Sequence, residues 1–380
     1  MAYTTIDDPS AHFQTALWSG DDATTQDITN DGNSDLQPDW VWVKCRNTNG
    51  NGFDHTVWDT SRGVSDSVNT SLSPSQNDVE GLGDNVTTTA QLGGVSAMLS
   101  DGFTVREGSI DDDSRYVNEN TRTYVGWQWK ANGGSRTTFA EDGNNPAGGY
   151  QANTTAGFSI VDYVGTGAAG TMAHGLGAVP SLIIIKNRDE ADSGMVYHKH
   201  MTAAPETDYM VLDTTANPTD NADRWNDTAP TSSVFTIATD HSVNADGENY
   251  IAYLWTPIQG YSAFGGPYTG NGNEDGPFQY TGFKPAYVVT KLLDTDSHHW
   301  TVYQTDGVGY NKDATKSLYW NTDYAEVDGT SGSGRMDFLS NGFKLRHTSF
   351  DGNWDGATYI WMAFAHQPFV TSGGVPCTAR

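Results

Sequence analysis

The distribution of apolar residues along the chain predicts short β-strands throughout. Runs of β-branched, leucine and aromatic residues are separated, roughly every eight to twelve residues, by clusters of Gly, Asn, Asp and Ser, which are typical of turns. Almost no stretch has the Ala/Leu/Glu/Lys-rich composition that favours a helix. We therefore expect an all-β protein.

One strand pattern occurs three times, each time with a proline six residues before a lysine and mostly apolar residues between them. The three copies run from Pro38 to Lys44, from Pro180 to Lys186 and from Pro285 to Lys291. Proline is tolerated at the first position of a strand. Before each copy lies an aromatic strand that ends in glycine. After each copy, an asparagine stands six residues before a tyrosine that opens a closing strand, at Asn118/Tyr124, Asn244/Tyr250 and Asn353/Tyr359. This order predicts one unit copied three times.

The repeat predicts three tandem β-sandwich or jelly-roll modules of about 100 residues, because each copy contains roughly seven strands. We place them at residues 1–130, 157–259 and 260–369. Each copy is long enough to have its own core. Residues 131–156, rich in Gly, Asn and Thr, are predicted to be a linker, and residues 370–380 a C-terminal tail that is ordered only against a neighbour.

Several predicted strands are apolar on both faces, as residues 182–185 and 359–364 show. A sheet with one solvated face alternates apolar and polar residues instead. The second face is therefore expected to be covered by a loop, a neighbouring module or another subunit. From this we expect a homo-oligomer, a trimer.

The formal net charge of −27 argues against a nucleic-acid partner, because a phosphate backbone would be repelled. No apolar run approaches the length of a membrane span, and the first residues lack the pattern of a signal peptide. Cys45 and Cys377 are expected to be free thiols, with an intersubunit bridge from the tail as the alternative.

Two groups of residues are candidate metal ligands. His198 and His200 would share one face of a strand, since alternate strand residues point the same way. Asp351, Asn353 and Asp355 copy the start of a calcium loop, although no carboxylate follows at its twelfth position. We prefer the alternative interpretations, surface histidines and a hairpin turn, and expect no metal or cofactor. Calcium is the cofactor to test, here or at the corresponding acidic run 111–113.

No catalytic motif is present: the glycine pairs lack the lysine of a phosphate loop, and there is no Gly-x-Ser-x-Gly elbow. No pair of carboxylates is singled out by an apolar setting, as a glycosidase would require. We expect a non-enzymatic protein. Four tryptophans could stack on sugar rings, although tryptophan in a sandwich more often belongs to the core; they are Trp225, Trp300, Trp320 and Trp354.

Residues 10–370 resemble a repeat family of tailed bacteriophages and marine viral genomes. The motifs that carry the resemblance run from Gly157 to Tyr163, from His174 to Gly177, from Asn244 to Ala252 and from Leu339 to Arg346. The first copy is more divergent, because Trp18 replaces the tyrosine and the His-Gly-Leu-Gly segment is missing.

The resemblance implies a virion structural protein with sandwich folds related to concanavalin-like lectins and with no catalytic residues. We expect a tail or fibre component that is made in the host cytoplasm, joins other virion proteins and contacts a host-surface glycan. One alternative is a capsid decoration or head vertex fibre protein. Another is a polysaccharide-degrading tailspike, whose purified form would shorten host polysaccharide.

Overall fold

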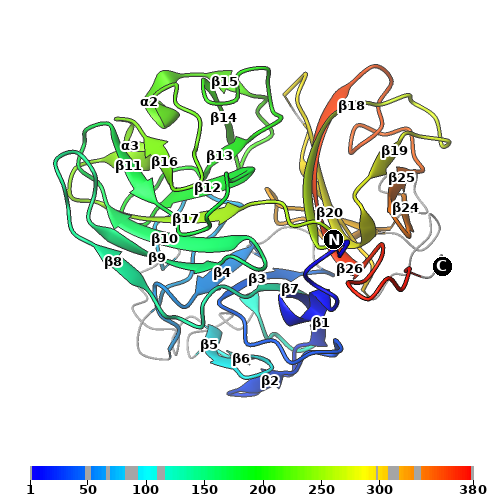
Figure 1. The fold of residues 1–380 in the computed structure, drawn as a ribbon. Coiled ribbons are helices and arrows are strands. Elements are labelled where there is room, and N and C mark those ends of the chain that lie inside the picture. The colour runs from blue at the N-terminus through cyan, green and yellow to red at the C-terminus, as the bar shows by residue number, and fades with distance from the viewer. Residues whose placement is uncertain are drawn as a thin grey trace.

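The computed structural model describes residues 2–47, 53–65, 69–81, 93–108, 116–296, 298–306, 316–328 and 335–377. Nearly all regular structure in these ranges is antiparallel β-sheet, so the all-β prediction is confirmed (Figure 1). The helical elements there are one 3-10 turn, η1 (Pro9–Ala11), and two four-residue helices, α2 (Ala222–Trp225) and α3 (His241–Asn244). No helix in the described ranges is long and apolar enough to span a membrane.

Each of the three predicted copies, here called the first, second and third repeats, contributes one large sheet and one small sheet. In the first repeat the large sheet has the order β1 (Phe13–Ser19), β7 (Thr123–Trp129), β3 (Trp40–Cys45), β4 (Thr56–Asp59). The small sheet has the order β2 (Gln26–Ile28), β6 (Gly102–Arg106), β5 (Gly94–Leu99). Apolar side chains of the two sheets form one buried cluster between them.

The second and third repeats use the same strand order and extend it. The second large sheet has the order β15 (Thr219–Asp220), β14 (Asp208–Val211), β13 (Met195–His198), β12 (Leu182–Asn187), β17 (Asn249–Trp255), β10 (Phe158–Val164), β9 (Gly148–Asn153), β8 (Thr137–Phe139), with the small sheet β11 (Gly170–Ala173), β16 (Val234–Ile237). The third has the order β18 (Ser262–Thr269), β26 (Thr358–Pro368), β20 (Phe283–Leu292), β21 (Trp300–Gln304), β22 (Lys316–Tyr319), β23 (Val327–Asp328), with the small sheet β19 (Phe278–Tyr280), β25 (Gly342–Leu345), β24 (Met336–Leu339). In all three, the closing strand lies between the first strand and the Pro-to-Lys strand.

Residues 131–156 differ from the linker that we expected, because they contain β8 and β9. β9 pairs with β10 from Phe158↔Asn153 to Tyr163↔Gly148, and so extends the second large sheet. The turn residues that suggested a linker serve this hairpin. The described part of the tail folds back on its own chain, where the Ser372 amide donates to Asp7 at 2.6 Å. Cys45 and Cys377 are not joined by a disulfide bond within the chain.

The repeated asparagine fixes the loop that follows the first strand of each large sheet. In the second repeat, Asn244 Oδ1 accepts a hydrogen bond from the Thr166 amide at 2.8 Å. Asn244 Nδ2 donates to the carbonyl oxygens of Ala168 and Ala238, each at 2.7 Å. The asparagines of the other repeats make corresponding contacts with their own loops. A buried amide with both ends satisfied explains why this position recurs.

The repeated tyrosine and glycine belong to the same corner. The Tyr250 hydroxyl accepts a hydrogen bond from the Ala245 amide at 2.8 Å and donates to the His241 carbonyl at 2.6 Å, and its ring stacks on Tyr163 with centroids 5.0 Å apart. A Cβ at Gly165 would lie 2.1 Å from the Ala245 carbonyl oxygen. Only glycine allows this close approach.

The second faces of the three large sheets pack against one another in the middle of the molecule (Figure 1). Trp129 of the first repeat contacts Trp255 of the second, with ring centroids 6.2 Å apart, and Phe364 of the third, at 5.3 Å. Trp40 and Tyr287 are buried in the same cluster. The second repeat's own buried residues are continuous with this shared core. The faces that were expected to need a cover are therefore covered by neighbouring repeats of the same chain.

The lysines of the Pro-to-Lys strands link the repeats in a ring. Lys44 Nζ donates to the carbonyl oxygen of residue 323 in the third repeat, Lys186 to that of residue 78 in the first, and Lys291 to that of residue 215 in the second, at 3.2, 2.8 and 2.9 Å. Each lysine also donates to a carbonyl of its own repeat. Burial lowers the pKa of each of the three ammonium groups to about 8.

Replacing the corner asparagine should destabilise the fold. Asn244→Ala leaves the Thr166 amide and two carbonyl groups without their partners, so the free energy of unfolding should fall by about 2–4 kcal/mol. Urea denaturation followed by tryptophan fluorescence measures the change. Asn217→Ala is the matched control, because the Asn217 side chain is half-buried outside the corner. Equal stability of the two variants would contradict the role of the corner.

The buried lysines predict an unusual dependence of stability on pH. Their folded pKa of about 8 lies below the ordinary value, so between pH 8 and 10 the unfolded chain binds protons that the folded chain has lost. The free energy of unfolding should therefore rise with pH, by up to about 1.4 kcal/mol per pH unit for each lysine. Above pH 10 buried tyrosines such as Tyr163 and Tyr303, whose pKa values are raised by burial, reverse the trend.

Urea titrations at closely spaced pH values test this dependence. Lys186→Met should reduce the slope of the free energy of unfolding against pH by the contribution of one lysine. A stability that falls steadily from pH 8 to pH 10 in the wild type would contradict the prediction.

Candidate functional site

The two candidate histidine ligands do not share one face of a strand. β13 ends at His198, so the alternation of a strand does not continue to His200. The His200 amide donates to His198 Nδ1 at 3.2 Å, and the two rings lie 5.9 Å apart, tilted by 51°. Burial lowers the pKa of His198 to about 3. His198 is thus a neutral core residue whose Nδ1 already accepts a hydrogen bond.

The candidate calcium loop is the corner of the third repeat. Asn353 is fully buried and holds the loop after the first strand, as Asn244 does. Burial raises the pKa of Asp351, whose carboxylate accepts a hydrogen bond from the Tyr319 hydroxyl at 3.3 Å. Asp355 is exposed. No three His, Cys, Asp or Glu side chains of the described ranges gather closely enough to hold a metal ion, and residues 111–113 lie outside those ranges.

Three of the four candidate sugar-stacking tryptophans belong to the interior. Trp225, Trp300 and Trp320 are 2%, 3% and 1% exposed. Trp354, by contrast, is 39% exposed. The structure therefore singles out one tryptophan that a ligand could reach.

Trp354 belongs to a group of rings that we call the aromatic patch, formed by the half-buried His298 and the exposed Phe350 and Trp354. The rings of His298 and Phe350 stack in parallel with centroids 4.2 Å apart, and Phe350 contacts Trp354 at 4.1 Å. Phe350 is 37% exposed. The aromatic patch thus presents adjoining ring surfaces to solvent.

The backbone under the aromatic patch is held by the repeated residues of the fold. The Tyr359 hydroxyl accepts a hydrogen bond from the Trp354 amide and donates to the Phe350 carbonyl, both at 3.0 Å. Lys291 Nζ donates to the His298 carbonyl at 2.8 Å. Because a tyrosine and a lysine that recur in every repeat fix all three segments, the rings are positioned before any ligand arrives.

The third repeat carries more rings at these positions than the second. The corresponding positions of the second repeat are those whose backbone groups contact Tyr250 and Lys186. His241 corresponds to Phe350, Ala245 to Trp354 and Asp192 to His298. The same scaffold thus carries three rings in the third repeat, and one ring, an alanine and an aspartate in the second. Sequence reasoning missed Phe350 and His298, although aligning the repeats around the tyrosine corner could have found them.

Exposed carboxylates lie close in sequence to the rings of the aromatic patch. Asp294, Asp296 and Asp355 are exposed on the loops that carry its rings. Burial and the nearby Lys291 ammonium lower the pKa of His298, so its ring is neutral at pH 7. Flat neutral rings beside carboxylate oxygens can stack on the apolar face of a sugar and accept hydrogen bonds from its hydroxyl groups.

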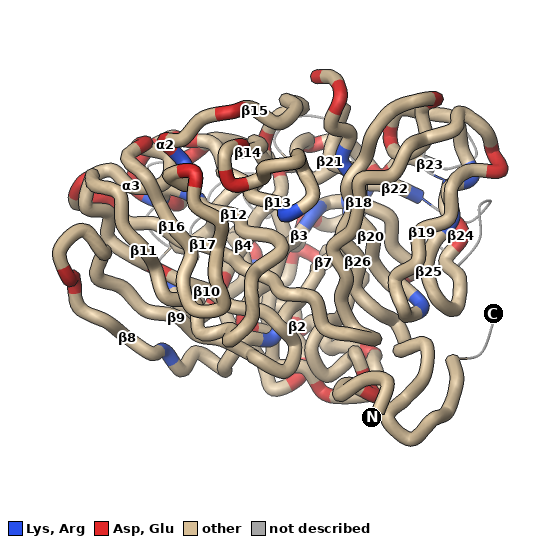
Figure 2. The backbone as a smooth tube through the Cα atoms, turned by 45° about the horizontal axis from the view of Figure 1, so that its top comes forward, with Lys and Arg blue, Asp and Glu red and all other residues tan. Residues whose placement is uncertain are grey.

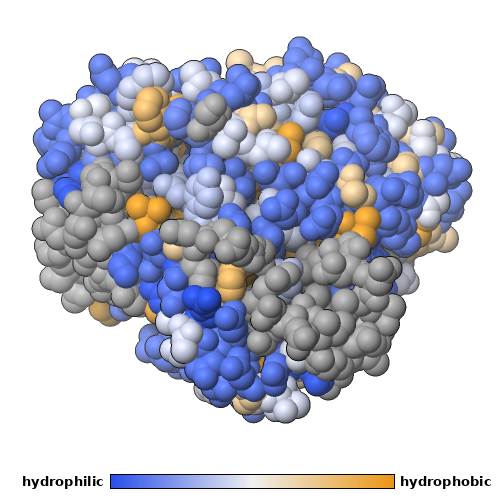
Figure 3. Space-filling model, turned by 180° about the vertical axis from the view of Figure 1, so that it is seen from behind, coloured by the Kyte–Doolittle hydropathy of each residue, from blue (hydrophilic) through white to orange (hydrophobic). Residues whose placement is uncertain are grey.

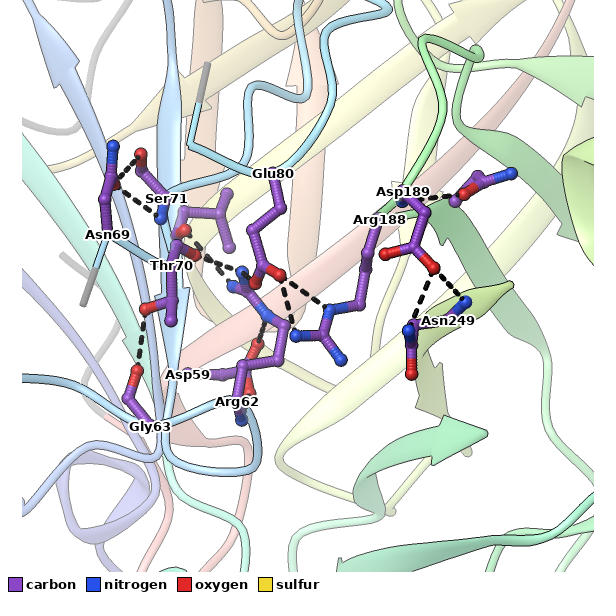
Figure 4. A network of polar contacts seen from close by, with 12 residues as sticks. Asp59, Arg62, Gly63, Asn69, Thr70, Ser71, Glu80, Arg188, Asp189 and Asn249 are labelled. Carbon is purple, nitrogen blue, oxygen red and sulfur yellow. Dashed lines mark hydrogen bonds and ion pairs between the residues drawn. The ribbon is translucent and has the colours of Figure 1, made fainter. Parts of the chain in front are cut away.

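A buried network of charged residues has a structural role instead (Figure 4). Arg62 lies between Asp59, at 2.6 Å, and Glu80, at 2.9 Å, and Glu80 also pairs with Arg188 of the second repeat at 2.7 Å. The Tyr253 hydroxyl donates to Asp59 at 2.7 Å. Arg62 is paired within the first repeat, whereas the Glu80–Arg188 ion pair and the Tyr253–Asp59 hydrogen bond cross the junction, so the network joins the first and second repeats.

Exposed and buried tryptophans should respond differently to substitution. Trp354→Ala removes a half-exposed ring, so it should change the free energy of unfolding by less than about 1 kcal/mol. Trp320→Ala removes a ring that is 1% exposed and donates to the Tyr287 hydroxyl at 2.8 Å, and should cost about 3–5 kcal/mol. Thermal unfolding measures both. A large loss in Trp354→Ala would mean that this ring supports the fold.

Comparison with known proteins gives a family without an assigned activity. No curated protein and no solved structure matches the chain. One family model, described as a domain of unknown function, matches residues 8–368. Since this match spans most of the chain, the protein belongs to the family DUF7483.

Proposed function

We propose that this protein is a non-enzymatic structural component of a tailed-phage virion, a tail or fibre protein that binds a host-surface glycan through the aromatic patch. The virion assignment rests on the resemblance of the repeat motifs. The glycan assignment rests on one observation, the exposed stack of His298, Phe350 and Trp354 with carboxylates beside it.

The geometry of the aromatic patch suits a sugar better than other ligands. An extended apolar partner would need a large apolar face, whereas the surface seen in Figure 3 is mostly hydrophilic with small, separate apolar spots. Rings whose backbone is fixed in advance lose little conformational entropy on binding. A shallow, rigid aromatic surface rimmed by hydrogen-bond acceptors is what stacking on a sugar ring requires.

The charge of the chain narrows the class of sugar. With a net charge of −27, and with Asp and Glu spread over the outer loops in Figure 2, the surface repels anionic polysaccharides. The proposed ligand is therefore a neutral or amine-bearing glycan. Its hydroxyl or ammonium groups would donate hydrogen bonds to the carboxylates of Asp294, Asp296 and Asp355.

The covered second faces change how assembly is proposed to occur. The apolar strands that led us to expect a homotrimer pack inside the chain, as Trp129 and Phe364 do across repeats. Contacts with further copies or with other virion proteins would therefore use the outer loops rather than these strands. This applies equally to a tail position and to the alternative of a capsid decoration protein.

Binding of the purified protein to an array of neutral and amine-bearing glycans, and to host cells, tests the proposal. Trp354→Ala and His298→Ala should each weaken binding at least tenfold, because each removes one ring of the stack. Tyr280→Ala is the matched control, since Tyr280 is 58% exposed on β19, outside the aromatic patch.

Two results would overturn the glycan assignment: no binding by the wild type, or equal binding by wild type and Trp354→Ala. Shortened polysaccharide after incubation would instead identify a tailspike enzyme. Binding to empty phage heads that raises their heat resistance would favour the decoration protein.

A further inference from the structure

We propose that the junction between the third and first repeats contains a binding site for a small organic cation with two amine groups. The site is a pocket of about 360 Å³, here called the junction pocket, and it is separate from the aromatic patch. Its wall includes Asp8, Gln14, Thr15, Asp31 and Asn33 of the first repeat and Asp306 of the third.

The junction of the first and second repeats has a side chain in the space that corresponds to the junction pocket. There the Gln151 amide of β9 donates to the hydroxyls of Thr60 and Ser61, at 2.8 and 2.7 Å, and accepts a hydrogen bond from the Gly134 amide at 3.1 Å. Gln151 is fully buried. A hydrogen-bond donor from an added strand thus fills the space between these two repeats.

The junction pocket occupies the corresponding place without such a filling side chain. By the register of the sheets, Thr15 of β1 corresponds to Ile160 of β10, the residue that pairs with Gln151 in β9. In the described part of the first large sheet, β1 has no strand on its outer side. Asp306 of the third repeat corresponds to Ser61 of the first repeat. Each residue lies two positions after the end of the strand that pairs with the Pro-to-Lys strand, which is β21 in the third repeat and β4 in the first. The donor that Gln151 supplies is therefore missing here.

One polar group on the pocket wall, the Thr15 hydroxyl, lies buried beside the carboxyl of Asp306. Thr15 is 6% exposed, and its hydroxyl makes no hydrogen bond of normal geometry. Burial is the main cause that raises the pKa of the Asp306 carboxyl to about 6; the Thr15 hydroxyl opposes the rise and the negative charge of Asp31 adds to it. A buried hydroxyl beside a buried carboxyl is costly without a partner. A bound donor would satisfy both groups.

The charge of the wall indicates a cation. Three lining residues are aspartates, and no lysine or arginine of the described ranges lines the pocket. The remaining titratable group on the wall is His366, whose pKa is lowered by burial and by the neighbouring Lys284 ammonium, so its ring is neutral at pH 7. The field in the junction pocket therefore favours a positively charged ligand.

The placement of the carboxylates on two different repeats indicates an extended organic cation rather than a metal ion. No three acidic or histidine side chains of the described ranges converge as metal ligands must. Asp8 already accepts hydrogen bonds from Ser10 and Ser34, which hold it on the opposite repeat from Asp306. A molecule with amines at both ends can reach carboxylates on two walls, which a single ion cannot. Such a ligand would also join the third repeat to the first.

Calorimetry with putrescine, a linear diamine, tests the proposal against 1,4-butanediol, which has the same length without charge. Putrescine should bind at pH 7.5 with submillimolar Kd and raise the Tm, and butanediol should not bind. Asp306→Asn should weaken putrescine binding at least tenfold, and Asp246→Asn, a substitution at an exposed site in the second repeat, should leave it unchanged. Binding by the wild type should also weaken as the pH falls through 6, where Asp306 becomes protonated.

No binding of putrescine at millimolar concentration would overturn the proposal, as would equal binding by Asp306→Asn. Binding of Ca²⁺ alone, without putrescine, would replace it with a metal site. Thr15→Val provides a second check, because it should weaken putrescine binding while its stability shows that the junction remains folded. None of these results depends on glycan binding, so the two proposals fail or stand separately.

Discussion

The constraint that governs this molecule is the need to cover both faces of each large sheet. A strand such as residues 182–185 exposes apolar surface on two sides, and each square ångström left in water would cost about 25 cal/mol. One face is covered by the small sheet of the same repeat. The other is covered by the large sheets of the two other repeats, whose aromatic rings meet in a shared core. Three copies in one chain therefore satisfy each other's exposed faces.

The junctions between repeats contain polar contacts as well as apolar packing. The polar contacts have the same direction around the ring of repeats. Each buried lysine donates to the next repeat in the same sense around the ring, so the three contacts close on themselves. A buried ammonium is tolerated because carbonyl oxygens surround it. Apolar packing alone would allow the sheets to slide or rotate. The lysine contacts require one arrangement.

Comparison of the repeats separates the recurring residues that hold the fold from the variable side chains that project from it. The corner of asparagine, tyrosine and glycine is needed in every repeat, so it recurs with fixed spacing. The side chains that project from the corner are free to differ, and only the third repeat places Phe350 and Trp354 there. In the same way the hairpin β8–β9 fills one junction, whereas the corresponding place beside Thr15 is a pocket. Differences between copies thus locate both proposed sites.

The sequence by itself determined the all-β class and the threefold recurrence of the strand motifs, because turn residues, strand composition and fixed spacing are local properties. It also showed that strands apolar on both faces need a second cover. Only the tertiary structure decided that this cover comes from the same chain, that residues 131–156 form strands, and that Trp354 is exposed while Trp320 is buried. These outcomes depend on which segments, distant in the sequence, pack together. The burial of a residue is set by these tertiary contacts and not by its neighbours in the chain.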